Sequence, residues 1–237
     1  MQKHKRITLR MAAGGILCLL GIGLMGYPLI SGWLQAAAQG EVIRSYQSDV
    51  MSLSEAQRRR AWQEAVAYNE ALLQLVQKEN ATAEEFQQQN LTYDQLLNEN
   101  ADGVMSYIEI PTIEVYLPIY HGATDDVLKR GVGHLINTSL PVGGPSTHCV
   151  ISAHRGDPSA ALFTHLDQLQ IGDEFQLYTL GEKLTYRVDQ IKTVRPYETD
   201  DFQITVGQDY VTLVTCTPYG INTHRLLVRG KRVTDET

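Results

Sequence analysis

Short hydrophobic runs separated by turns dominate the second half of the chain. From residue 101 onward, runs of β-branched and aromatic residues alternate with turns such as Pro141-Val142-Gly143-Gly144-Pro145. These runs predict strands at Val104–Ile110, Ile113–Ile119, Cys149–Ala153, Glu174–Thr179, Leu184–Val194, Tyr210–Thr215 and Arg225–Val233. About seven or eight short strands favour a barrel or a sandwich over alternating α/β units. We therefore expect a mainly β domain over residues 101–237.

One helix is expected to interrupt these strands, directly after Asp157-Pro158. Proline suits the first turn of a helix, because its missing N–H would be unpaired there in any case. The residues that follow could continue such a helix on an apolar face; they are Ala160, Ala161, Leu162 and Leu166.

Residues 35–100 have the pattern of a helical arm. The stretch 42–77 is rich in Gln, Glu, Ala, Leu and Arg and contains no Pro or Gly. Three pairs have the spacing of a capping box and predict helix starts: Ser52 with Glu55, Thr82 with Glu85, and Thr92 with Gln95. We expect a helix from about Leu53 and two shorter ones, separated by loops around Asn80-Ala81 and Asn90.

Residues 11–34 carry no charged side chain, and roughly 20 apolar residues suffice for a helix to cross a bilayer. We expect a transmembrane anchor here. Basic residues flank only its N-terminal side, which makes residues 1–10 a cytoplasmic tail and places the rest of this single-pass chain outside the cell. A cleaved signal peptide is the alternative, since Ala36-Ala37-Ala38 offers the small residues that a signal peptidase accepts. However, the apolar stretch is longer than the hydrophobic region of a signal peptide, which usually has about 7–15 residues.

Composition and charge exclude several classes of function. The chain is 43% hydrophobic and 20% charged, as in folded proteins, and its net charge is −7 although four basic residues precede the first acidic one. The acidic main body lacks the basic footprint of a nucleic-acid-binding protein. Cys and His do not have zinc-type spacing, and neither a phosphate-binding glycine loop nor a dinucleotide fingerprint is present. We expect no metal and no cofactor.

Cys216 is the strongest candidate for a nucleophile. It lies between the hydrophobic run Tyr210–Thr215 and the turn Thr217-Pro218-Tyr219-Gly220, and a strand that runs into a turn can present a reactive group accessibly and in a fixed direction. One alternative is a small buried hydrophobic residue, and another is a disulfide with Cys149, which an extracytoplasmic compartment permits. Strand alternation places Cys149 on the opposite face from His154, which argues against the disulfide if His154 serves the thiol.

His154 and Arg225 are candidates to act with this thiol. His154 lies where a hydrophobic strand ends, and an imidazole can exchange a proton with a thiol at neutral pH. Arg225 opens the last strand, so a tight hairpin would bring its guanidinium beside Cys216 to stabilise an oxyanion. The residues alone leave other histidines open, namely His121, His134, His148, His165 and His224. They also leave Arg155 and Arg229 as rivals to Arg225, and Asp157 as a group that could orient His154.

The stretch Thr212–Arg225, TLVTCTPYGINTHR, resembles the sortases, and their class C, pilus-assembling branch in particular. The resemblance extends through Leu140–Gly144, Ser152–Gly156 and Gly103–Pro111 and covers nearly all of residues 93–233. It implies an eight-stranded sortase-type β-barrel with short helices, whose catalytic residues are Cys216, His154 and Arg225. It also implies a cysteine transpeptidase that cleaves an LPxTG-like sorting signal between Thr and Gly. The acyl group would form a thioester on Cys216 and pass to a lysine amine of a pilin subunit.

Two features depart from the class C pattern. No Pro occurs between Asn80 and Asn100, so the arm lacks the Asp-Pro-aromatic lid motif of many relatives; either Phe86 or Tyr93 covers the site, or the site is open. Only Thr234–Thr237 follows the last basic stretch, so the N-terminal segment would be the sole anchor. The alternative functions are attachment of surface proteins to peptidoglycan, and a non-catalytic, membrane-tethered assembly factor in which Cys216 is structural.

Overall fold

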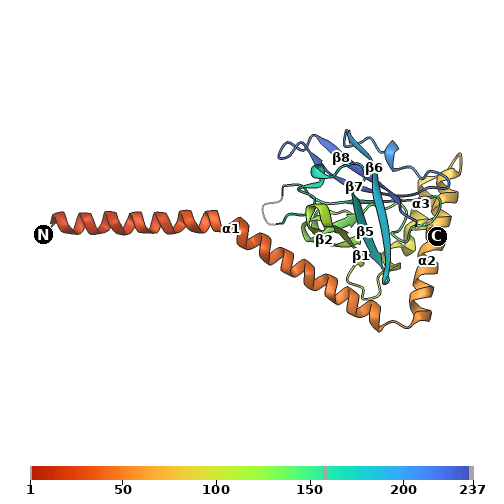
Figure 1. The fold of residues 1–237 in the computed structure, drawn as a ribbon, viewed down its shortest axis with the longest axis horizontal. Helices are drawn as coiled ribbons and strands as arrows, with labels where there is room; N and C mark the ends of the chain where they lie inside the picture. The colour runs from red at the N-terminus through yellow and green to blue at the C-terminus, as the bar shows by residue number, and fades with distance from the viewer. Residues whose placement is uncertain (1, 157–159, 235–237) are drawn as a thin grey trace.

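Eight strands close into one barrel in the computed structural model of the chain, which describes residues 2–156 and 160–234 (Figure 1). The strands are β1 (Val104–Ile110), β2 (Val115–His121), β3 (Val132–His134), β4 (Thr147–Ser152), β5 (Glu174–Thr179), β6 (Glu182–Val194), β7 (Asp209–Thr217) and β8 (His224–Arg232). Their order around the barrel is β1-β2-β3-β4-β7-β8-β6-β5. The pairs β2–β3 and β4–β7 are parallel and the other pairs are antiparallel. The expected mainly β, eight-stranded barrel is confirmed.

The hydrophobic pattern located most strands closely. The predicted bounds of β1 and β5 match the structure, and β2 begins two residues late because Pro111–Ile113 forms a short 3₁₀ turn, η2, ending at Glu114 in a left-handed conformation. The pattern missed β3 and the short helix α4 (Asp125–Arg130). A strand of three residues is too short to show a period-two pattern. The formation of β3 therefore depends on its pairing with the neighbouring strands β2 and β4.

Alternation along β4, β7 and β8 produces two separate apolar clusters. One set of residues, including Cys149 and Leu213, belongs to the main core of the barrel. The intervening residues Val150, Val214 and Leu227 form a second buried cluster on the outer face, against which Phe202 packs. Because successive side chains of a strand point to opposite faces, the residues of this second cluster lie on the outer face of the barrel, near the ends of their strands.

The N-terminal third is helical, as expected, but the helix ends differ. The elements are α1 (Gln2–Ser52), α2 (Glu55–Gln77), α3 (Ala83–Gln89) and the 3₁₀ helix η1 (Asn90–Gln95). The capping box of α2 is Ser54 with Gln57, rather than Ser52 with Glu55. The Thr82 box is confirmed, whereas the predictions of a cap at Thr92 and a loop at Asn90 were wrong, because α3 continues directly into η1.

Buried tyrosines attach the helical arm to the barrel. The Tyr46 hydroxyl donates to the Met105 carbonyl at 3.1 Å and accepts from the Leu180 amide at 2.8 Å. The Tyr93 hydroxyl lies 2.8 Å from His134 Nδ1. Tyr93 is 2% exposed and Phe86 packs against the main core, so both aromatic side chains of the expected lid are engaged in arm packing.

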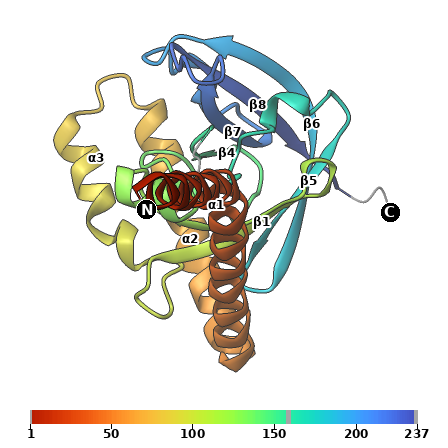
Figure 2. The same ribbon diagram turned by 90° about the vertical axis from the view of Figure 1, so that its left-hand side faces the viewer.

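Helix α1 extends well beyond the barrel (Figure 1). In the view turned by 90°, α3 and β6 lie at opposite sides of the molecule (Figure 2). Within this helix, the surroundings of individual residues are described for Leu17, Gly21, Tyr27 and residues 30–52. Among the residues it describes, no helix combines the length and apolarity needed to cross a bilayer. The expected span at residues 11–34 falls mostly on side chains outside the described residues.

The helix expected after Pro158 is absent from residues 160–165, which form turns followed by the 3₁₀ helix η3 (Leu166–Gln168). Asp157 and Pro158 lie outside the described residues. The Phe163 amide donates to the distant His154 carbonyl at 3.1 Å, and Leu162 takes a positive φ of 40°. Burial of Ala160, Leu162 and Phe163 in the core therefore outweighs the helical spacing.

Candidate active site

The β7–β8 hairpin places Cys216 directly opposite Arg225. These two residues are Cα partners in the antiparallel ladder, and Thr217 and His224 form the next pair. Opposite residues on one face of such a ladder have Cβ atoms about 4.5–5.5 Å apart. The side chains of Cys216 and Arg225 therefore leave the backbone side by side. The spacing of these two residues in the sequence predicts this arrangement, and the hairpin provides it.

Strand β4 brings His154 to the same end of β7. Ser152 pairs with Val214 in the parallel ladder, and the register continues because the Ala153 amide donates to the Val214 carbonyl at 3.1 Å. The Thr215 hydroxyl donates to the Ala153 carbonyl at 2.8 Å and holds the two strands together at this point. The next residue along is His154, level with Cys216. Nothing in the sequence indicates this function of Thr215, because threonine is common in any strand.

Cys216 and Cys149 are both free thiols with different environments. Cys216 is partly exposed, whereas Cys149 is 3% exposed and belongs to the main core. Burial raises the pKa of the Cys149 thiol far above its usual range, so this sulfur stays protonated. The disulfide alternative is therefore wrong, and the alternation argument that separated Cys149 from the face of Val150 is confirmed.

Arg225 keeps donors available, unlike its two rivals. Its guanidinium donates only to the backbone carbonyls of Asn222 and His224, at 3.3 and 3.1 Å, and forms no ion pair within the described part of the chain. Arg229 makes two hydrogen bonds to the Asp189 carboxylate, at 3.0 and 2.8 Å. Carbonyl contacts leave the charge of Arg225 uncompensated, so it can bind a developing oxyanion.

Arg155 has a supporting position instead. Its side chain is 7% exposed, forms an ion pair with Asp167, and donates to the Thr217 hydroxyl at 3.1 Å. The guanidinium therefore fixes the end of β7 next to Cys216. Removing Asp167 would leave the buried Arg155 guanidinium without this partner, which is costly, whereas Asp167 itself is about half exposed.

Of the six candidate histidines, His154 alone lies level with Cys216 and has no ring hydrogen bond among the described residues. The rings of the others contact neighbouring groups: His121 with the Gly103 and Leu96 carbonyls, His134 with Tyr93 and Ser139, His148 with Gln203 and Thr212, His165 with Gln168, and His224 with Thr223. Asp157, the expected orienting group, lies outside the described residues, among which no cluster suited to a metal ion is found.

Comparisons with known proteins agree with this geometry. Residues 108–233 match the family described as the sortase domain. Over 130 residues the chain is 31% identical to sortase D of Bacillus subtilis (strain 168), covering 54% of this chain and 63% of that protein. It is 30% identical to sortase A of Streptococcus agalactiae over 48% of this chain and 47% of that protein. The chain thus spans about half to two thirds of the length of these curated relatives.

Solved structures match a larger part of the chain. Sortase C1 from Streptococcus agalactiae is 45% identical, with a TM-score of 0.75, over 83% of this chain and 100% of that one. Sortase C from Clostridium perfringens, solved with the C-terminal cell wall sorting motif, is 41% identical, with a TM-score of 0.70, over 82% and 98%. The sortase match covers more than half of the 237 residues and these neighbours are class C sortases, so the chain belongs to the sortase family.

Proposed function

We propose that this chain is a class C sortase that polymerises pilus subunits, with Cys216 as nucleophile, His154 as acid and base, and Arg225 as oxyanion stabiliser. The observation that supports it most directly is the register that sets Cys216 opposite Arg225 and level with His154. The neighbour solved with a cell wall sorting motif supports a substrate of that class, a peptide with an LPxTG-like signal.

In the first half of the reaction, the Cys216 sulfur attacks the carbonyl carbon of the Thr–Gly bond. Arg225 donates hydrogen bonds to the oxyanion, and its positive charge favours the thiolate beforehand. His154 gives a proton to the departing glycine amine, so the C–N bond breaks and a thioester remains on Cys216.

In the second half, a lysine amine of another pilin subunit attacks the thioester. His154 takes a proton from this amine, the C–S bond breaks, and an isopeptide bond forms while the thiol is restored. A thioester retains enough reactivity for an amine to compete with water. These steps use only the side chains of the protein and the two substrates.

The proposal includes the arrangement at the membrane. Residues 1–10 form the cytoplasmic tail, residues 11–34 the anchor and residues 35–100 the arm, with the barrel at 101–237 outside a Gram-positive cell. The uncharged stretch and its basic flank support this orientation.

The test uses the full chain in detergent micelles with an LPxTG-type peptide, followed by intact mass, beside Cys216→Ala. A mass increase equal to the acyl fragment, absent from the variant, is expected. With purified pilin, lysine-linked ladders distinguish polymerisation from attachment to peptidoglycan. Neither adduct nor cleavage, together with a Cys216 that resists alkylation, would favour the non-catalytic assembly factor.

A further inference from the structure

One short turn of the β6–β7 connection lies against the barrel face that carries the site. The connection leaves β6 at Val194, whose Cα partner is Arg225, so it starts beside the site. It then forms the 3₁₀ turn η4 (Asp200–Phe202), and Phe202 packs on the outer cluster that contains Val214. Val214 is two residues before Cys216 on the same face of β7. The turn is therefore a wall on the face of β7 that carries Cys216.

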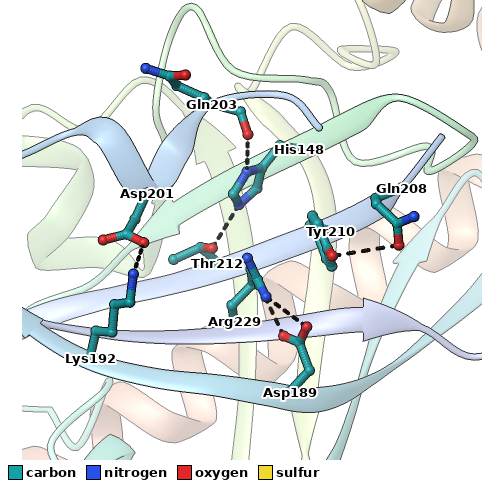
Figure 3. Close-up of polar contacts among 9 residues, drawn as sticks. All are labelled: His148, Asp189, Lys192, Asp201, Gln203, Gln208, Tyr210, Thr212 and Arg229. Atoms are coloured by element: carbon teal, nitrogen blue, oxygen red, sulfur yellow. Dashed lines mark hydrogen bonds and ion pairs between the residues drawn. The ribbon is translucent and has the colours of Figure 1, made fainter. Parts of the chain in front are cut away.

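His148 on β4 holds this turn from below (Figure 3). Its Nδ1 lies 3.0 Å from the Gln203 carbonyl oxygen and its Nε2 lies 2.7 Å from the Thr212 hydroxyl. A carbonyl only accepts, so Nδ1 carries the hydrogen and donates to Gln203, while Nε2 accepts from Thr212. His148 is 1% exposed, and a buried side chain bonded at both nitrogens has a fixed orientation.

The charges around His148 are consistent with a neutral ring. Burial is the main cause that lowers the pKa of His148, and the guanidinium of Arg229 on β8 lowers it further. The hydrogen bond to Gln203 and the carboxylates of Asp189 and Asp201 act in the opposite direction. Lys192 on β6 forms an ion pair with Asp201, so the turn has a second attachment at the surface. The turn is thus attached at two points, by the buried hydrogen bond from His148 and by the more exposed ion pair with Lys192.

Apolar side chains stand exposed on both connections that border the site. Tyr197 and Val206 on the β6–β7 connection are each 70% exposed, and Tyr219 and Ile221 on the β7–β8 connection are 60% and 67% exposed. Such side chains can bind an apolar peptide lying between the connections. Their spacing depends on where η4 is held.

We propose that His148 is a positioning residue for the substrate: through the Gln203 carbonyl it fixes the η4 wall at the distance from Cys216 that an extended peptide requires. The proposal rests on the proposed transpeptidase function. His148 touches neither the thiol nor the peptide, so it acts on binding of the peptide and leaves the chemical step unchanged.

Two substitutions separate the two hydrogen bonds of the ring. His148→Asn places an amide nitrogen near the position of Nδ1, so this variant retains the bond to Gln203. The longer side chain of His148→Gln reaches the position of Nε2, so it retains the contact with Thr212 and loses Gln203. We expect His148→Gln to raise KM for the sorting peptide about three- to tenfold, the effect of one hydrogen bond, with kcat within about twofold of wild type. His148→Asn should stay close to wild type in both constants.

Thr212→Val is the control for stability. It leaves the bond to Gln203 and removes the other, so it lowers the melting temperature while KM stays near wild type. Hydrogen exchange of the Phe202 and Gln203 amides, measured on the full chain, supplies a second readout. Exchange should accelerate in His148→Gln and stay slow in Thr212→Val and His148→Asn.

Each outcome points to one conclusion. Unchanged amide exchange in His148→Gln would show that His148 does not hold the turn, and faster exchange with an unchanged KM would show that the turn does not position the peptide. Either result overturns the proposal. A wild-type chain that cleaves no sorting peptide counts against the transpeptidase function itself, and the exchange data then report on the tether separately.

Discussion

Among single residues, the site depends on which side chains are left without partners. Within the part of the chain that the structure describes, Arg225 bonds only to carbonyls, while Arg155 and Arg229 are occupied by carboxylates. A residue whose charge is already compensated cannot respond to charge that develops in a transition state. The partners of each arginine therefore identify the one that can act.

Replacing Arg225 tests this directly. Arg225→Lys retains the charge but loses the planar fork, so we expect kcat/KM for peptide cleavage to fall about 10²–10³-fold, as when one oxyanion donor is removed. Arg187→Lys is the matched control, because Arg187 pairs with Glu174 on the exposed surface and should leave activity close to wild type. Equal activity of the two variants would exclude Arg225 as the oxyanion stabiliser.

Proton transfer leads to a second prediction about a single side chain. His154→Gln removes the acid and base next to Cys216, and we expect cleavage of the sorting peptide to fall about 10²–10⁴-fold. His165→Gln changes an exposed histidine bonded to Gln168 and should retain wild-type rates. Steady-state kinetics of both variants measure the difference. A His154→Gln variant that retains wild-type activity would move the role to another group.

Among the elements, the arm is attached through a buried histidine that must stay neutral. Burial lowers the pKa of His134 to about 4. Its Nε2 donates to the Ser139 carbonyl and its Nδ1 accepts from the Tyr93 hydroxyl of η1. Protonation would add a hydrogen at Nδ1 where Tyr93 donates. Docking of the arm therefore favours the neutral ring.

A dependence of stability on pH follows. The unfolded chain binds a proton at His134 below pH 6.5, whereas the folded chain binds it only near pH 4, so this contribution is complete above pH 6.5 and is lost as the pH falls toward 4. From about pH 7 to about pH 5 we expect a loss of about 2 kcal/mol in the free energy of unfolding. Urea unfolding at both pH values measures it. The difference in the free energy of unfolding between the two pH values should shrink in His134→Asn. If that variant showed the full difference, the pH dependence would arise from another group.

In the molecule as a whole, closure of the barrel brings the site together from separate parts of the chain. Strand β8 pairs with β7 on one side and with the long β6 on the other. On β8, Gly230 lies against the ring of Phe175, and a Cβ there would come within 2.5 Å of it. The barrel core beside β8 therefore has no room for a further carbon at Gly230.

This close packing predicts the effect of one methyl group. Gly230→Ala should lower the free energy of unfolding by about 1–3 kcal/mol, because the aromatic rings of the core must move. Gly32→Ala is the matched control: a Cβ there meets nothing within 4 Å, so stability should be unchanged or slightly higher. Urea unfolding of both variants tests the prediction, and equal stabilities would show that the core adapts.

The sequence alone predicts those elements that are specified by a local pattern of residues. Period-two patterns placed β1 and β5, the Thr82 box placed α3, and the TLVTCTPYGINTHR stretch indicated the family and a hairpin joining Cys216 to Arg225. These features depend on neighbours within a few residues, whose pattern is visible in the sequence.

The remaining features required the folded chain, because they depend on contacts between distant segments. The parallel pairing of β4 with β7 brought His154 level with Cys216, and the partners of six histidines and three arginines separated candidates that look alike in sequence. The failed helix after Pro158 and the short β3 have the same cause. Burial and long-range hydrogen bonds outweigh local propensity, and only the three-dimensional arrangement shows which of them form.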